Sequence, residues 1–567
     1  MSHRDTHHSD GRTQGARYVF PQPDGSVWLG LKLSTLVVLG TALASAIALV
    51  MSGGPLPLAA LLLITVAVVS LLPIADRTLL DWLSPAARHL LLLINGGKAV
   101  ATARHGRQGP RAWRLPMPPE CGPLTVHALP TSRGGDSSHL PFDGGADGAE
   151  VDEGWGVVAA ARHRRSRGST RRPGRQTVIF DVLSLDGVGL LDPAGQDTRL
   201  AAWGSCLDAL AADARVQHLQ WITHSRPDTR RHLTGGPHDV HSLEASPPGS
   251  TPRSALELRR DYHEMVTAAA REAWEHRHLL AVTFSINPSL DETGPARPGT
   301  PGSETGRSAG AHRRGADPRP DPLLLDGMRD GMRDVASLLL TADLLARPLT
   351  SGEIGPLLRL LTDPSLSDDS RDPGVRGVEP DPVAHERWGV RCRRSGWDHV
   401  RTDDTWHRSY TVSGWPQLPL AADWLAPLLH AIPPLGTARA LAVHVTAVAP
   451  LHAVRQARAA AAKAHLDAAD RSRLGMHPAG RDGSHTDQRA ADDADALEAE
   501  LAAGYRLLQT RAVLTISAPD PALLRQATTA LRTTAATCRL DLRPLHGQHQ
   551  YGLVATLPLG LLPGATR

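Results

Sequence analysis

Two pairs of histidines have a spacing at which they could share a metal ion. His276 and His278 are one residue apart before a predicted strand, and His546 and His549 lie three positions apart in a predicted turn. Neighbouring imidazoles of this kind are common ligands of transition metals. However, Arg277 stands between the first pair, and the 28 histidines of the chain are dispersed without further ligand spacing. We therefore expect surface histidines, and no bound metal or cofactor.

No motif for nucleophilic or phosphate chemistry is complete. Gly306–Gly310 matches the pattern G-x-S-x-G, but it lies in a Pro/Gly-rich stretch without the strand and helix that form the strained nucleophile turn. Gly96–Ala99 is the nearest string to a P-loop, and it lacks both the first glycine and the hydroxyl that binds Mg²⁺. His263 and His385 each precede a glutamate but lack the second histidine of a zinc protease. We expect no enzyme, and an active site that the sequence conceals stays open as a third hypothesis.

An arginine cluster carries the strongest charge signal. Its members are Arg162, Arg164, Arg165, Arg167, Arg171, Arg172 and Arg175. No acidic residue follows them before Asp181, so the cluster could neutralise the phosphates of DNA or of lipid headgroups. No aromatic residue interleaves, which gives no support to base stacking. Phosphate contact and a merely solvated insert both stay open.

Length and composition set wider limits. The chain has 567 residues, which allows three or four domains, or fewer domains with long inserts. Hydrophobic residues make up 41% and charged residues 21%, enough apolar material for a sizeable core. A net charge of +3 over this length does not mark the whole protein as a nucleic-acid binder. The four cysteines are far apart, which excludes a disulfide scaffold and suggests a reducing compartment.

The elements that would position these groups begin with two apolar runs. Leu33–Met51 and Leu56–Ile74 carry no charge, and each has about 19 residues, near the ~20 that cross a bilayer as helix. A buried core hairpin is the alternative, although core helices rarely stay apolar on every face. Basic residues flank the pair and none lies in the loop, so we predict a multi-pass protein of the cell membrane with both termini cytoplasmic. The expected anchors at the lipid bilayer interface are Trp28, Lys32, Arg77 and Trp82.

The rest of the chain divides by composition. We expect a disordered tail over 1–30, the transmembrane hairpin over 31–76, a basic juxtamembrane segment over 77–115, and a cytoplasmic α+β domain over 116–567. Low-complexity stretches rich in Gly, Pro, Ser and Arg bury too little apolar area to fold. These inserts are predicted near 132–176, 226–253, 288–322, 365–382 and 475–490.

Strands and helices alternate between the inserts, which predicts an α+β fold. The expected strands are Thr177–Leu183, His218–Thr223, Leu279–Ile286, Ala440–Val448, Ala512–Ser517, Arg539–Arg543 and Tyr551–Leu557. The expected helices are Asp197–Ala214, Ala255–His276, Leu323–Leu345, Glu353–Leu361, Leu451–Asp470 and Ala491–Gln509, with a further helix capped by Asp520. The final elements predict a ferredoxin-like βαβ piece at the C-terminus.

Two segments carry a resemblance to a known family. The apolar pair followed by RAWRLP at Arg111–Pro116 looks like the membrane subunit of actinobacterial integrative conjugative elements. In that family a PrgI-type membrane hairpin is joined to a domain similar to the N-terminal part of TraC-type conjugation ATPases. The segment GQHQYGLVATLPLG (Gly547–Gly560) resembles the run Q-x-G-x-x-x-T-L-P-L-G that ends this domain before the P-loop motor. Trp406–Ser409 and Ala440–Arg458 fall where the family has comparable elements, so the resemblance covers about two thirds of the chain.

The resemblance implies a function without catalysis. Its motifs are structural, so it brings no catalytic residue, and the chain ends at Arg567 without the motor domain. We therefore expect a membrane-anchored subunit of a conjugation or type IV secretion-like apparatus, with a separate P-loop ATPase and a second copy of itself as partners. The alternative is a membrane-tethered protein that binds DNA through the arginine cluster.

Overall fold

The computed structural model defines the course of the chain in a series of segments. The described residues are 26–90 with short gaps, 112–115, 124–129, 155–160, 175–184, 191–227, 274–285, 322–364, 393–416, 424–430, 436–473 and 482–562.

A first ferredoxin-like unit lies in the middle of the chain. Its elements are β8 (Arg175–Ser184), α4 (Pro193–Ala212), β9 (Val216–Pro227), β10 (Trp274–Ser285), α7 (Pro322–Thr341) and β11 (Leu344–Pro348). The strands pair antiparallel in the order β9-β10-β8-β11. A βαββαβ chain with its first and third strands in the centre is the ferredoxin-like arrangement.

A second unit repeats this topology. Its elements are β14 (Thr405–Gly414), α9 (Ala426–His430), β15 (Ala438–Ala447), β16 (Leu508–Ala518), α12 (Pro521–Thr537) and β17 (Asp541–Pro544). The strands pair in the order β15-β16-β14-β17. Asp520 caps α12, because its carboxylate accepts the backbone N–H groups of Ala522 and Leu523. The last half of this unit, β16-α12-β17, is the βαβ piece that the sequence predicts.

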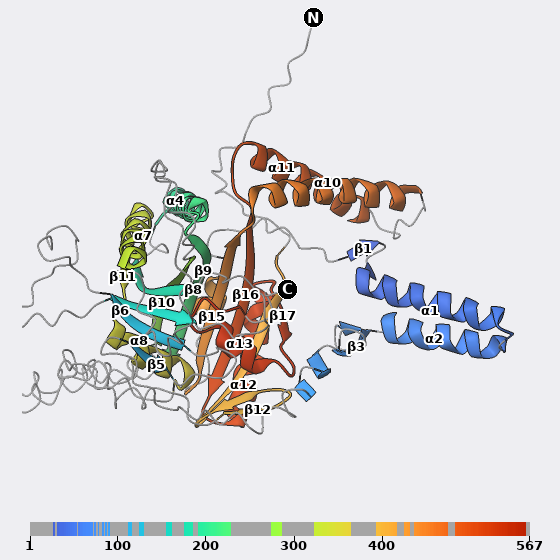
Figure 1. Cartoon of the computed structure of the whole chain (residues 1–567), viewed down its shortest axis with the longest axis horizontal. Coiled ribbons are helices and arrows are strands. Elements are labelled where there is room, and N and C mark those ends of the chain that lie inside the picture. The colour runs from blue at the N-terminus through green and yellow to red at the C-terminus, as the bar shows by residue number, and fades with distance from the viewer. Residues whose placement is uncertain are drawn as a thin grey trace, which may run out of the picture.

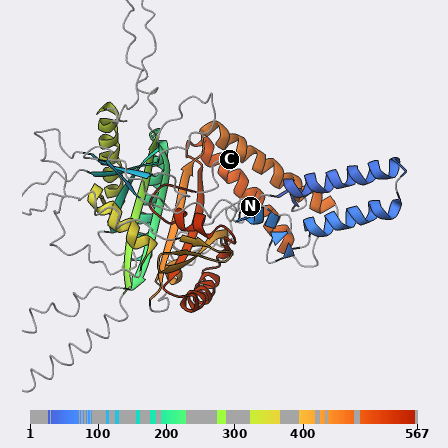
Figure 2. The same ribbon diagram turned by 60° about the horizontal axis from the view of Figure 1, so that its bottom comes forward.

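The two units join into one sheet. Strands β9 and β15 pair antiparallel from Arg439 opposite Ser225 to Val445 opposite Leu219, and a sheet of 13 strands results. Figure 2 shows the green strands of the first unit beside the orange strands of the second. The outer edge strands are β5 (Ala112–Leu115), β6 (Leu124–Leu129) and β7 (Trp155–Ala160) at one end, and β12 (Arg393–Ser395) and β13 (Val400–Thr402) at the other.

Helices cover both faces of the sheet. On one face, α4 and α7 bury Phe180 and α12 buries Leu514, and Val443 packs against both of these apolar cores. On the opposite face, α8 (Ser351–Thr362) and the segment that begins with α13 (His549–Ala555) form a third core around Ile222 and Leu279. The sheet is thus the central layer of the folded body (Figure 1).

A helical arm leaves the sheet between β15 and β16. It consists of α10 (Pro450–Arg473) and α11 (Asp482–Ala502), which pack along each other and project beyond the strands (Figure 1). Ala453, Ala457 and Ala461 recur at a spacing of four residues and are buried between the helices.

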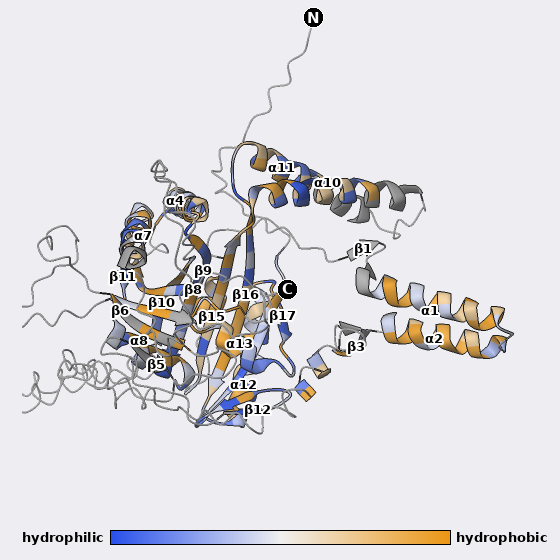
Figure 3. Cartoon of the chain, viewed as in Figure 1, coloured by the Kyte–Doolittle hydropathy of each residue, from blue (hydrophilic) through white to orange (hydrophobic). Residues whose placement is uncertain are grey.

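The N-terminal hairpin differs from its prediction. Helices α1 (Leu33–Met51) and α2 (Leu56–Leu71) lie side by side, and Figure 3 shows that both are largely hydrophobic. They have 19 and 16 residues, which is about 28 and 24 Å of helix against about 30 Å of hydrocarbon. Helix α2 ends early because Pro73 biases the residue before it away from helix. Among the described residues, no helix has both the length and the apolarity to cross a bilayer. The predicted transmembrane hairpin, and with it the multi-pass location in the cell membrane with cytoplasmic termini, is therefore wrong.

Several predicted boundaries also change. Tyr551–Leu557 is predicted as a strand, but His549–Ala555 is helical, because a short apolar run that is buried on all sides does not distinguish the two states. The predicted inserts contain regular structure, namely β7 within 132–176 and the start of α11 within 475–490. Strand β10 begins at Trp274, inside the predicted helix Ala255–His276, whose first part lies outside the described residues.

Candidate functional site

The segment from His549 to Gly560, here called the strap, crosses the sheet from one ferredoxin-like unit to the other. It contains α13 and the Thr-Leu-Pro-Leu-Gly run, and it is almost wholly buried. It is the same stretch on which the resemblance to conjugation ATPases rests.

The strap begins on the second unit. His549 accepts the backbone N–H of Ser409 in β14 at its Nδ1, over 3.1 Å, and its own carbonyl accepts the Ser409 hydroxyl. A Cβ on Gly552 would lie 2.3 Å from the Ser409 Cβ, so only glycine fits there. Thr556 donates to the Leu553 carbonyl and contacts the hydroxyl of Thr515 in β16.

The middle of the strap lies over the joint between the units. Gln220 in β9 donates its amide to the carbonyls of Ala555 and Leu557, at 2.8 Å each, and accepts the Gly560 backbone N–H at 2.9 Å. His444 in β15 donates from Nε2 to the same Ala555 carbonyl at 2.8 Å. One side chain from each unit therefore holds the same turn of the strap.

The strap ends on the first unit. Gly560 has a φ of +60°, and a Cβ there would lie 2.0 Å from the Thr283 hydroxyl. Thr177 and Thr283 share a hydrogen bond beneath it, and Thr177 also donates to the Leu559 carbonyl. The final glycine of the motif thus satisfies both a left-handed backbone and a close approach to two strands.

The buried histidines under the strap are held neutral. His218 and His444 contact each other over 3.1 Å, and because His444 donates from Nε2, its Nδ1 accepts from His218. Burial lowers the pKa of His218 to about 3 and the pKa of His444 to about 4. Each ring is an uncharged hydrogen-bonding group, and the arrangement joins the two units rather than transferring protons at neutral pH.

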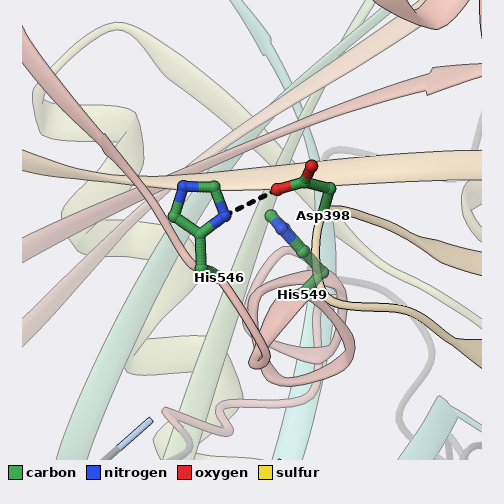
Figure 4. A group of neighbouring side chains, drawn as sticks. All are labelled: Asp398, His546 and His549. Atoms are coloured by element: carbon green, nitrogen blue, oxygen red, sulfur yellow. Dashed lines mark ion pairs between the residues drawn. The ribbon is translucent and has the colours of Figure 1, made fainter. Parts of the chain in front are cut away.

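A second cluster lies at the start of the strap. Asp398, which follows β12, lies with His546 and His549, and one ligand atom of each residue lies within 4.8 Å of the others. Figure 4 shows His546 facing Asp398, with 2.7 Å between His546 Nδ1 and the carboxylate, and His549 beside them. Asp398 is exposed and His549 is fully buried. These residue types are those that bind divalent transition metals.

Hydrogen bonding at His549 opposes a metal in this arrangement. Its Nδ1 accepts the Ser409 N–H, so the neutral ring carries its proton on Nε2. A metal at Nδ1 would displace the Ser409 N–H, and a metal at Nε2 would force the ring proton onto Nδ1, where it would face the same N–H donor. Burial, reinforced by the charge of Arg408, lowers the pKa of His549 to about 3. The cluster therefore serves to anchor the strap, with His546 paired to Asp398.

The chain that follows the N-terminal hairpin packs against the same cluster. Trp82 packs against Trp397 and His546, with ring centroids 5.9 and 5.4 Å apart. His89 meets Trp397 edge-on at 5.3 Å, and Trp397 stacks on His546. Trp82, an expected bilayer anchor, thus lies against the folded body.

The other sequence-predicted residues are placed as follows. Trp28 and Lys32 lie in a two-stranded pair, β1 (Ser26–Trp28) with β2 (Leu31–Lys32), and Arg77 lies in a second, β3 (Pro73–Ile74) with β4 (Arg77–Thr78). Arg175 begins β8 and is exposed. Arg162, Arg164, Arg165, Arg167, Arg171 and Arg172 lie outside the described residues, as does Gly306–Gly310. Contact of the arginine cluster with DNA or lipid stays a prediction.

The first histidine pair forms no joint site. His276 contacts the Ser225 hydroxyl at 2.9 Å and His278 contacts the Thr223 hydroxyl at 3.2 Å, both across the β9–β10 ladder. Arg277 between them pairs with Asp181. Each side chain is used in strand pairing.

Sequence reasoning misses Gln220 and Asp398. Gln220 reads as one polar residue in an apolar strand, and Asp398 is remote in sequence from the histidines that it joins. The only signal for the strap is the motif itself, with two glycines and a threonine in fixed register. A scan against protein-family models and a search of curated proteins found no match.

Proposed function

We propose that this chain is a non-catalytic docking subunit of a conjugation or type IV secretion-like DNA-transfer apparatus, and that its α+β body binds a separate P-loop ATPase. One observation carries the proposal. The segment that resembles the end of the ATPase N-terminal domain is the strap, and three of its motif positions occupy places that constrain the residue type.

Those three positions argue against a chance resemblance. Gly552 and Gly560 leave no room for a Cβ, and Thr556 hydrogen-bonds within the strap and to β16. A matching string in an exposed loop would have no such requirements. The strap also holds both units in one body, which supports a rigid platform rather than a catalytic cleft.

The helical arm offers the contact surface for the ATPase. Helix α11 carries seven acidic residues and one basic residue, and Asp492 and Asp493 are exposed on it. Both faces of the central sheet are covered by helices or by the strap, whereas the arm projects away from them (Figure 1). An exposed acidic surface of this kind can speed association with a basic surface on a partner.

The test is affinity capture of the full chain from its native host, followed by rebinding of the captured ATPase as a purified protein. The arm variant replaces Asp492 and Asp493 with lysine. The matched control replaces Asp330 and Asp404, two exposed acidic residues elsewhere, with lysine. We expect the wild-type chain and the control to bind a P-loop ATPase, and the arm variant to bind it at least tenfold more weakly.

Two results would overturn the proposal. The first is the absence of any enriched P-loop ATPase that rebinds the purified chain. The second is retention of DNA in place of an ATPase, with binding that weakens steeply as salt rises and disappears when the seven arginines become glutamine. That second result would favour the DNA-binding alternative.

A further inference from the structure

The α1–α2 hairpin is built with its small residues inside and its large residues outside. Ala42, Ala46 and Ala59 are buried between the two helices. Eleven large apolar side chains of the hairpin point outward and are exposed: Val37, Leu43, Ile47, Val50, Met51, Leu56, Leu58, Leu61, Leu62, Ile64 and Val68. A hairpin that was complete on its own would place its large side chains within.

Three hydroxyl groups of the hairpin are hydrogen-bonded within their own helices. No residue from Leu33 to Leu71 is charged. The hydroxyls of Thr41, Ser45 and Thr65 donate to carbonyls of their own helix, at 2.7 to 2.9 Å. Hydroxyls bound in this way leave the outer surface apolar and suit contact with another apolar surface.

The exposed area is large enough for a stable interface. Together these side chains expose the equivalent of about six whole residues, on the order of 1,000 Å², against roughly 800 Å² per partner in a stable complex. The largest apolar patch on a typical monomer covers only about 300–600 Å². A monomer in water is therefore an unfavourable state for this hairpin.

We infer that the α1–α2 hairpin is an interaction surface whose partner is the same hairpin of a second copy of the chain, so that the two form a four-helix bundle. The surface has no charged side chain with which to select a chemically different partner. The hairpin itself offers a matching surface of equal length, and such a patch is self-complementary about a two-fold axis. The inference does not rest on the binding of an ATPase, since it concerns a different surface.

The test measures the mass of the full chain in detergent-free buffer by light scattering and sedimentation velocity. The disrupting variant is Ile47→Glu with Ile64→Glu, two exposed residues on different helices. The matched control is Leu451→Glu with Leu466→Glu, two exposed leucines on the arm. We expect the wild type and the control to have the mass of two chains, and the disrupting variant to dissociate at least a hundredfold more readily.

Three outcomes would overturn the inference. One is a single-chain mass for the wild type. Another is an aggregate without a defined mass. The third is flotation of the wild type with phosphatidylcholine vesicles that is lost in the disrupting variant, since the hairpin would then bind lipid. Circular dichroism of both variants checks that the body remains folded.

Discussion

Replacement of Gln220 by leucine tests whether the strap joins the two units. Leucine has nearly the same volume, but it removes three hydrogen bonds to the strap. The Ala555 carbonyl keeps its bond from His444, and the Leu557 carbonyl keeps its bond from the Leu559 N–H, so the Gly560 N–H is the group that loses its partner. At about 1–3 kcal/mol for a buried group left unpaired, the expected loss in the free energy of unfolding is about 1–3 kcal/mol.

The loss is measured by urea unfolding and by amide hydrogen exchange. We expect a lower unfolding midpoint, and exchange of strap peptides that is at least about fivefold faster, since 1.4 kcal/mol corresponds to a factor of ten. Gln509→Leu is the matched control, because Gln509 is exposed on β16 and its loss should change stability by less than about 0.5 kcal/mol. Equal midpoints and equal exchange for wild type and Gln220→Leu would refute the role assigned to this side chain.

Three further predictions concern neighbouring features. Gly560→Ala should lower the free energy of unfolding by more than about 2 kcal/mol, because the left-handed φ and the contact with Thr283 both oppose a Cβ. Gly53→Ala is the control and should lower it less, because Gly53 also has a left-handed φ but has open space around it. Equal urea midpoints for the two variants would contradict this prediction. Burial holds the pKa of His218 and His444 below the unfolded value of 6.5, so the unfolded chain takes up more protons than the folded chain as the pH falls from 6.5 towards 4. Each of the two histidines should therefore lower the free energy of unfolding by about 2 kcal/mol at pH 5. A urea midpoint that is constant from pH 7 to pH 5 would contradict this prediction. Trp82→Ala should speed proteolysis of the chain after the hairpin without lowering the unfolding midpoint of the body, and unchanged proteolysis would show that the Trp82 contacts do not hold this segment.

Local pattern predicts most elements of the two units. The apolar β-rich runs at Thr177–Leu183 and Leu279–Ile286 lie within or overlap β8 and β10, and Asp520 caps its helix as expected. These features succeed because a buried central strand and an N-cap are determined by adjacent residues. The joining of the two ferredoxin-like units into one sheet is not visible in this way, because it depends on pairing between β9 and β15, which are distant in the chain.

The prediction of the hairpin fails for a different reason. Hydropathy alone cannot distinguish helices that cross a bilayer from shorter apolar helices, and here Pro73 shortens the second helix. The prediction of the candidate site also fails in part. Gln220 hydrogen-bonds the strap and Asp398 pairs with His546, and both partners lie far along the chain. The motif at Gly547–Gly560 marks the strap in sequence, but its conformation as a helix and turn depends on burial against the sheet.

The position of the strap near the end of the chain has a consequence during synthesis. Strand β11 of the first unit ends at Pro348 and the strap begins at His549. At about 5–20 residues per second, a ribosome takes roughly 10–40 seconds to make the intervening stretch. Throughout that interval the strap does not yet cover the half of the sheet that carries Gln220, His218 and Thr283. Water can solvate those polar side chains, but Ile222 and Leu279 on the same face also lack the strap during this interval, so this face is a site at which the nascent chain can aggregate.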